Sequence, residues 1–283
     1  MPKQIKIACI QSNPKPSIEE AIEEARELVA LALTERPDFI FFPEYCGGLK
    51  SNGGKFDPPV ASEKDHQFLA FISECAYKNS VWIMVGSIAI SGFNGMYYNR
   101  GYIIDNRGNI HSKYNKIHLF DIQLDKNFVF EESATVIGGN VSKAVDTPYG
   151  KIGHTICYDL RFPQLFRSLA LEGAEILAIP SAFTRKTGEA HWHTLVRARA
   201  IENGSFVIAP CATGEVTGGG SSYGHSLIVD PWGHVLEDGG EERGVIVAQI
   251  DLGEVEKVRA KIPSLYNDRE FNFPKKETER AFI

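Results

Sequence analysis

Short apolar stretches alternate with longer amphipathic ones along most of the chain. The longer stretches carry apolar residues at helical spacing, and the first begins with Ser17 and Glu20, a capping-box pattern. The shorter stretches are apolar runs of strand length. The pattern predicts helices over 17–33, 62–79, 162–172, 189–203 and 253–260, and strands over 5–11, 38–44, 81–90, 151–157, 175–183, 205–212 and 244–250.

Two predicted hairpins interrupt this alternation of strands and helices. One turns at "DNRGN" (105–109), and the other turns at "DPWGH" (230–234) between strands 223–230 and 235–238. Hairpins within a strand–helix pattern favour mixed sheets over purely parallel ones. The chain has no linker of Gly/Ser/Pro type and no internal repeat. We therefore expect an α/β fold in one domain over 1–283, with a short C-terminal extension over about 262–283.

Composition narrows the classes of partner. The 283 residues carry a net charge of −6, which argues against a nucleic-acid or anionic-membrane surface, since either favours a basic patch. No apolar run reaches the length of a membrane span, and the first residues lack a secretory signal pattern. We expect a cytoplasmic protein that binds neither nucleic acid nor membrane.

The cysteines and histidines give no sign of a disulfide or a metal site. The cysteines are odd in number and include no CxxC pair; they are Cys9, Cys46, Cys75, Cys157 and Cys211. Free thiols in a reducing compartment are the simplest interpretation. His191 and His193 are two apart on a predicted helix and so face different directions, which keeps one ion from binding both. We expect no metal.

Three residues with ionisable or nucleophilic side chains come at or just after the ends of predicted strands: Glu44, Lys116 and Cys157. Ligand sites in open α/β sheets collect at strand ends. A carboxylate can take the proton of a thiol, and an ammonium favours the thiolate and stabilises an oxyanion by roughly 3–4 kcal/mol. Each residue alone also has an ordinary explanation, because cysteines are often core residues and glutamates or lysines are mostly solvated.

The sequence around all three residues resembles the nitrilase superfamily, the carbon–nitrogen hydrolases. The motifs are "FFPEY" around Glu44, "YNKIHLF" around Lys116 and "GHTICYDLRFP" around Cys157, in the family's order; "GAEILAIPSAFT" and "AHWHTLVRARAIEN" add to them. The resemblance implies a four-layer αββα sandwich with mixed sheets and a homodimer or larger homo-oligomer. It also implies Glu44 as general base, Lys116 as oxyanion partner and Cys157 as the nucleophile that forms a thioester, with no metal or organic cofactor.

The same resemblance implies two supporting groups. Members of the family often have a second glutamate that holds the lysine, and "FVFEES" offers Glu131 and Glu132. We choose Glu132, which directly precedes the serine, and leave Glu131 as the alternative. The backbone N–H of Tyr158 is the expected second oxyanion donor.

Within the family, the chain most resembles the small amidases that act on deaminated glutathione, with the ω-amidases next. Their substrates carry a carboxylate, so a cation near the site is expected. Arg161 is the candidate, with an ion pair to Asp159 as its alternative role. Phe183 and Thr184 are expected to line the pocket, with core or capping roles as alternatives.

The predicted function is therefore hydrolysis of a small carboxylate-bearing amide to an acid and ammonia. The alternatives within the family are an ω-amidase on 2-oxoglutaramate or 2-oxosuccinamate and a hydrolase of N-carbamoyl amines or other aliphatic amides. A Cys–His hydrolase with His118 or His154 as base and a catalytically idle scaffold also stay open. The stretch "TGGGSSYG" (217–224) lacks the GK[ST] ending of a phosphate loop and is expected to be a mobile loop over a neighbouring subunit's pocket.

Overall fold

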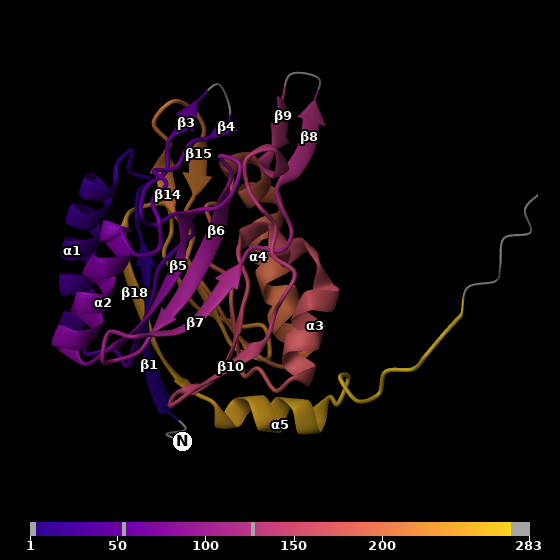
Figure 1. Ribbon diagram of the computed structural model, residues 1–283. Helices are drawn as coiled ribbons and strands as arrows, with labels where there is room; N and C mark the ends of the chain where they lie inside the picture. The colour runs from indigo at the N-terminus through magenta and orange to yellow at the C-terminus, as the bar shows by residue number, and fades with distance from the viewer. Residues whose placement is uncertain (1–3, 53–54, 126–127, 273–283) are drawn as a thin grey trace, which may run out of the picture.

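Two six-stranded sheets pack face to face between two pairs of helices (Figure 1). This is a computed structural model, and it describes residues 4–52, 55–125 and 128–272. Helices α1 (Ile18–Thr34) and α2 (Gln67–Asn79) cover one sheet, and α3 (Pro163–Leu171) and α4 (Arg185–Asn203) cover the other. The predicted α/β sandwich of four αββα layers with mixed sheets is confirmed.

The first sheet has the strand order β18-β1-β2-β5-β6-β7. Strands β1, β2 and β5 run parallel, and the pairs β1–β18, β5–β6 and β6–β7 are antiparallel. The late strand β18 thus completes the sheet that the first strand begins. The bounds are β1 (Gln4–Gln11), β2 (Phe39–Phe41), β5 (Trp82–Ser91), β6 (Tyr97–Ile104), β7 (Ile110–Asn115) and β18 (Gly244–Asp251).

The second sheet has the order β10-β11-β12-β13-β16-β17. Its central strands β11, β12 and β13 run parallel, and antiparallel strands flank them. The bounds are β10 (Ala144–Thr147), β11 (Gly150–His154), β12 (Ile176–Ala178), β13 (Phe206–Ala209), β16 (Leu227–Val229) and β17 (Val235–Asp238).

Three small hairpins gather at one end of the sandwich (Figure 1). They pair β3 (Ser51–Asn52) with β4 (Lys55–Phe56), β8 (Asp121–Asp125) with β9 (Phe128–Glu131), and β14 (Thr213–Glu215) with β15 (Ser221–Tyr223). Helix α5 (Gly253–Lys261) lies at the opposite end, and the chain then runs away from the body. Residues 273–283 of the predicted C-terminal extension lie outside the described residues.

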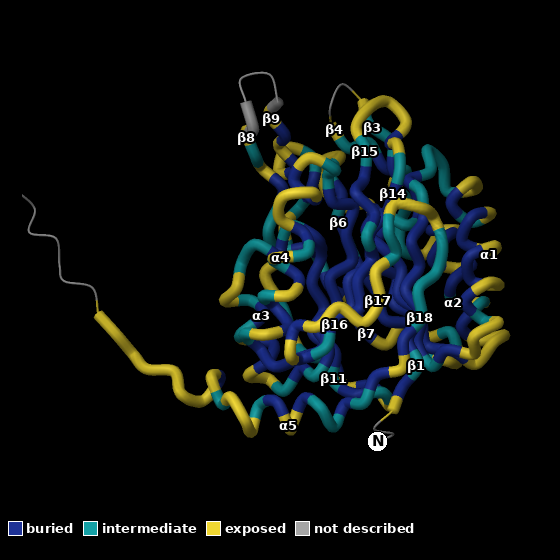
Figure 2. Tube along the Cα trace, turned by 180° about the vertical axis from the view of Figure 1, so that it is seen from behind, coloured by how far each residue is buried: buried dark blue, intermediate teal, exposed yellow. Residues whose placement is uncertain are grey.

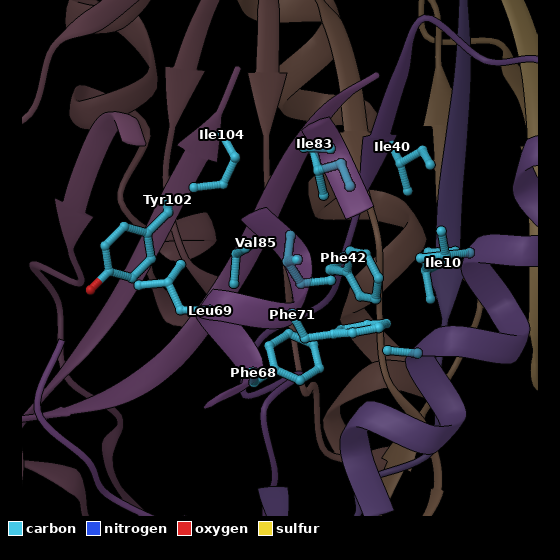
Figure 3. Packing of buried hydrophobic residues seen from close by; sticks show 14 of the residues in the cluster. Ile10, Ile40, Phe42, Phe68, Leu69, Phe71, Ile83, Val85, Tyr102 and Ile104 are labelled. Atoms are coloured by element: carbon cyan, nitrogen blue, oxygen red, sulfur yellow. The ribbon is translucent and has the colours of Figure 1, made fainter. Parts of the chain in front are cut away.

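Both faces of the central strands are buried, which explains why these strands are continuous apolar runs. In β1, Ile7 and Cys9 face the second sheet, whereas Ala8 and Ile10 face α1 and α2. Figure 3 shows side chains of this helix-facing layer, among them Ile10, Phe42 and Phe68. Figure 2 shows the same arrangement, with mostly buried strands between helices whose outer sides are exposed.

Several predicted boundaries were wrong, and local chemistry explains two of them. The helix predicted from residue 62 begins at Gln67, because Ser62 and Asp65 form a separate turn in which Asp65 N donates to Ser62 Oγ at 3.2 Å. The strand predicted to end at Cys157 ends at His154. Cys157 has φ = 47°, a left-handed conformation outside the extended region, so Cys157 itself is not part of a regular strand. The helix predicted over 189–203 begins earlier, at Arg185.

No helix in the described part of the chain is long and apolar enough to cross a membrane.

Candidate active site

The three residues singled out in the sequence lie together in one small cavity. Glu44 follows β2, Lys116 follows β7 directly, and Cys157 follows β11, so the two sheets contribute together. The cavity is lined by Glu44, Phe56, Lys116, Phe120, Cys157, Tyr158, Ala182, Phe183, Thr184 and Thr187.

Cys157 begins a tight 3-10 turn, Cys157–Arg161. Its left-handed backbone costs of order 1–3 kcal/mol, which the surroundings must offset. Cys157 N donates to Pro180 O at 2.9 Å, and the buried Asp159 carboxylate accepts from Ile156 N at 2.9 Å and from Tyr114 OH at 2.7 Å. These bonds hold the turn, and the N–H groups of its first residues stay free of helical partners. The Tyr158 N–H is one of them.

Glu44 is almost fully buried, at 2% exposure, and both of its oxygens are hydrogen-bonded. Oε1 accepts from Lys116 Nζ and from Asn99 Nδ2, both at 2.9 Å. Oε2 accepts from the backbone N–H of Ala182 at 2.9 Å. The carboxylate is therefore held in one orientation beside Cys157.

Glu132 holds the other side of the lysine. Lys116 Nζ donates to Glu132 Oε2 at 2.9 Å and to Oε1 at 3.1 Å. Glu132 also accepts from Phe120 N at 2.6 Å and from Tyr45 OH at 3.2 Å. Glu131 is exposed, so of the two glutamates in "FVFEES" it is Glu132 that contacts Lys116.

The buried charges set the protonation of the cluster. Burial alone would lower the pKa of Lys116, but Glu132 and Glu44 raise it well above its ordinary value. Lys116 is thus an ammonium shared by two carboxylates, and the three groups together carry a net charge of −1.

This balance decides the state of the thiol. Burial raises the pKa of Cys157 well above its ordinary value, the charge of Glu44 raises it further, and Lys116 offsets only part of the effect. The resting thiol is therefore protonated, with its hydrogen bond to Glu44 favouring that form. The sequence correctly indicated that an ammonium favours the thiolate, but burial and the carboxylate outweigh it. A base must take the proton as the sulfur reacts.

The predicted substrate-contacting residues divide into two groups. Phe183 and Thr184 line the cavity. Arg161 lies beside it: its guanidinium carbon is 5.3 Å from the ring centre of Phe183, and its nitrogens are 3.3 Å from His191 Nδ1. Asp159, the alternative partner of Arg161, is engaged by other groups.

An outer cavity of about 230 Å³ adjoins the inner one, because both are lined by Phe56, Ala182 and Thr184. Gly218, Gly219 and Gly220 line it as well. A Cβ on Gly218 would lie 1.9 Å from Ser51 O, so only glycine permits this approach. The glycine-rich stretch thus borders a cavity of its own chain, and its place over a neighbouring subunit's pocket stays a prediction.

Neither histidine proposed as an alternative base lines the inner cavity. His118 Nδ1 lies 2.7 Å from Asp159 Oδ1, and its ring stacks on Phe162. Burial lowers the pKa of His154 to about 3, and its ring borders a separate groove with Arg100 and Lys113.

Sequence reasoning missed several residues of the site. Thr187 lies three residues after Thr184 in the first turn of α4, and this helical spacing was a usable signal. Asn99 and Tyr45, which bind the two glutamates, carried no comparable signal.

Comparison with known proteins places the chain in a family. Residues 6–260 match the model of the family described as carbon-nitrogen hydrolase. The chain belongs to the carbon–nitrogen hydrolase family. It is 36% identical over 262 residues to a deaminated glutathione amidase of Synechocystis sp., covering 91% of this chain and 96% of the relative.

Two further relatives extend the likeness. The chain is 32% identical to omega-amidase NIT3 of Saccharomyces cerevisiae, over 95% of this chain and 94% of the relative. The crystal structure of Saccharomyces cerevisiae Nit3, a member of branch 10 of the nitrilase superfamily, superposes with a TM-score of 0.80 at 29% identity, covering 92% of this chain and 95% of that chain. The protein is thus a carbon–nitrogen hydrolase with the nitrilase fold.

Replacing Lys116 tests the buried charge cluster. Lys116→Met leaves Glu44 and Glu132 buried without their cation, which should lower the free energy of unfolding by about 3–5 kcal/mol. Lys113→Met is the matched control on β7, because it removes only a surface pair with Glu63 and should cost less than about 1 kcal/mol. Urea unfolding of both variants measures the difference. Equal losses would contradict this account of the cluster.

Proposed function

We propose that the protein is a thiol amidase that hydrolyses a small carboxylate-bearing amide, of the deaminated glutathione type, to an acid and ammonia. The observation that carries the proposal is the buried set of Glu44, Lys116 and Glu132 beside the Cys157 thiol. This set supplies a base, an oxyanion partner and a nucleophile in one cavity, which is what acyl transfer through a thiol requires.

In the first half of the reaction, Cys157 attacks the amide carbonyl carbon while Glu44 takes the thiol proton. The high pKa of the buried thiol makes this base necessary. Lys116 and the Tyr158 N–H hold the oxyanion. The Glu44 proton then passes to the amide nitrogen, the C–N bond breaks, and ammonia leaves a thioester on Cys157.

In the second half, water replaces the sulfur. Glu44 takes a proton from the water, the resulting hydroxide adds to the thioester carbonyl, and Lys116 again stabilises the oxyanion. Collapse of this intermediate releases the carboxylic acid, and the proton returns to the Cys157 sulfur. Glu132 acts as a positioning residue, since its two bonds to Lys116 fix the ammonium.

Charge complementarity supports a substrate whose carboxylate points away from the glutamates. The cluster carries a net charge of −1, so a substrate carboxylate is repelled from its inner end. The cavity lining also includes Thr184 and Thr187 at the start of α4, where the helix dipole favours an anion. It includes Phe183 as well, and the Arg161 guanidinium lies over the Phe183 ring.

The alternative substrates are 2-oxoglutaramate and 2-oxosuccinamate. An omega-amidase is among the relatives, which supports this activity as the alternative. Simple aliphatic amides and N-carbamoyl amines without a carboxylate would need no cation near the inner cavity.

The proposal extends to the domain organisation, the oligomeric state and the location of the protein in the cell. We propose one hydrolase domain over 1–283 with its extension from about 262, a homodimer or larger homo-oligomer, and a cytoplasmic location. The five free cysteines support a reducing compartment. The family resemblance supports the assembly.

Ammonia release from a panel of amides tests the proposed activity. The panel holds deaminated glutathione, 2-oxoglutaramate, 2-oxosuccinamate, a carbamoyl amine and an aliphatic nitrile. We expect the fastest turnover on deaminated glutathione, no turnover in Cys157→Ala, and normal turnover in Cys75→Ala, whose thiol lies on α2 outside the cavity.

Other outcomes separate the alternatives. Preference for 2-oxoglutaramate or 2-oxosuccinamate would change the assigned substrate to that of an ω-amidase and leave the proposed mechanism unchanged. Full activity in Cys157→Ala would contradict the mechanism, and a folded protein inactive on the whole panel would favour the idle scaffold.

The two adjacent glutamates provide a matched pair of variants. Glu132→Gln removes a counter-charge of Lys116 and loosens its position, so kcat should fall by about 10²-fold with little change in KM. Glu131→Gln, at the exposed neighbour, should leave both constants unchanged. Steady-state ammonia release measures them, and equal effects of the two variants would contradict the role given to Glu132.

A further inference from the structure

A cluster of side chains that can act as metal ligands lies outside the inner cavity. The His–Asp cluster consists of His193, His225 and Asp238. His193 Nε2 lies 3.0 Å from Asp238 Oδ2, and His225 Nδ1 lies 2.9 Å from Asp238 Oδ1. One ligand atom from each of the three residues lies within 4.8 Å of the other two.

The cluster joins elements that are distant in the chain. His193 is on α4, His225 comes just before β16, and Asp238 is the last residue of β17. No short motif contains these residues, which is why ligand spacing in the sequence gave no signal. His191, two residues from His193, contacts Arg161 instead, as expected for neighbours that face different directions on a helix.

The three groups form a ligand set for a transition-metal ion. Two imidazoles and one carboxylate suit Zn²⁺, Co²⁺ or Ni²⁺ and do not suit Mg²⁺ or Ca²⁺, which prefer oxygen ligands. With bonds of about 2.0–2.1 Å, adjacent ligands of a tetrahedral ion lie roughly 3.3 Å apart. His193 and His225 lie 3.0 and 2.9 Å from different oxygens of Asp238, and one ligand atom from each residue lies within 4.8 Å of the other two. Side-chain shifts would bring the three atoms to that spacing, with each imidazole binding the ion through its unprotonated nitrogen and carrying its proton on the other ring nitrogen.

The surroundings hold two of the ligands in place. Asp238 Oδ1 accepts from Gly240 N at 2.9 Å, and His225 N donates to Gly240 O at 2.6 Å. The Tyr223 ring stacks on the His225 ring with centres 4.6 Å apart. The side chains of His193 and Asp238 keep 36% and 35% exposure, so an ion can enter from solvent and complete its coordination with water.

We propose that the His–Asp cluster binds one divalent transition-metal ion per chain and ties α4 to the edge strand β17. The cluster is connected to the inner cavity in two ways. Thr184 and Thr187 at the start of α4 line that cavity, and Tyr223, stacked on His225, donates its N–H to Phe183 O at 2.8 Å. The ion is structural in this proposal and takes no part in amide hydrolysis.

Cobalt titration of the chelator-treated full-length protein tests the proposal. Co²⁺ binding is followed by calorimetry and by visible absorption, and a Cys157→Ala background removes the active-site thiol as a competing ligand. We expect one ion per chain with a nitrogen–oxygen spectrum. His193→Gln, His225→Asn and Asp238→Asn should each weaken binding at least about tenfold, because even second-shell changes cost that much.

His234→Gln is the matched control. His234 Nδ1 lies 2.8 Å from Asp230 Oδ2, a similar pair that has a single histidine, so the control should bind Co²⁺ as tightly as the parent. Zn²⁺ should raise the melting temperature of the parent and of His234→Gln, and should not raise that of His193→Gln.

The proposal is overturned if the parent shows no saturable binding of Co²⁺ or Zn²⁺. It is also overturned if binding survives unchanged in the three cluster variants or falls equally in His234→Gln. Circular dichroism without metal identifies any variant that fails to fold. If His225→Asn or Asp238→Asn fails to fold, binding to His193→Gln decides the outcome, because the partly exposed side chain of His193 can be replaced with little effect on folding.

Discussion

The ammonium of Lys116, buried between the carboxylates of Glu44 and Glu132, is the interaction on which the site depends. Removing three charges from water is costly, and only short bonds among them, together with those from Asn99, Tyr45 and two backbone N–H groups, offset that cost. Burial and the charge of Glu44 then keep the neighbouring thiol protonated by raising its pKa, since Lys116 offsets only part of their effect. Glu44 is consequently both a partner of the lysine and the nearest acceptor for the thiol proton.

The sandwich makes this cluster because both sheets end at the same place. Glu44, Asn99 and Lys116 come from the first sheet or the loops after its strands, and Cys157 follows a strand of the second. The layer between the sheets, with Ile7, Phe41 and Ile208 among its residues, sets the separation of the two groups. Asp159 then fixes the turn that directs Cys157 into the cavity, and the small hairpins complete its walls.

The pattern of apolar residues predicted a mixed α/β fold in one domain, whereas the four layers and the roles of Glu44, Lys116 and Cys157 were expected from the resemblance that their motifs carry. The sequence predicted Glu132 over Glu131 only through resemblance, since burial is what distinguishes them. Asn99, which binds both glutamates, lies within a strand and has no local signal. The left-handed turn at Cys157 depends on contacts with Pro180 and Asp159, so the strand boundary was misplaced. The protonation of the thiol depends on its burial and on the charges of Glu44 and Lys116 beside it, and spacing along the chain does not contain either.

The most direct test of the account is a search for the thioester on Cys157. The enzyme is mixed with its fastest amide substrate and quenched in acid within one turnover. The protein is then digested, and the mass of the peptide that contains Cys157 is measured by mass spectrometry. The account predicts a peptide heavier by the substrate minus ammonia, with no adduct in Cys157→Ala. Ammonia release during the first turnover with an unmodified Cys157, or with the acyl group on another residue, would contradict it.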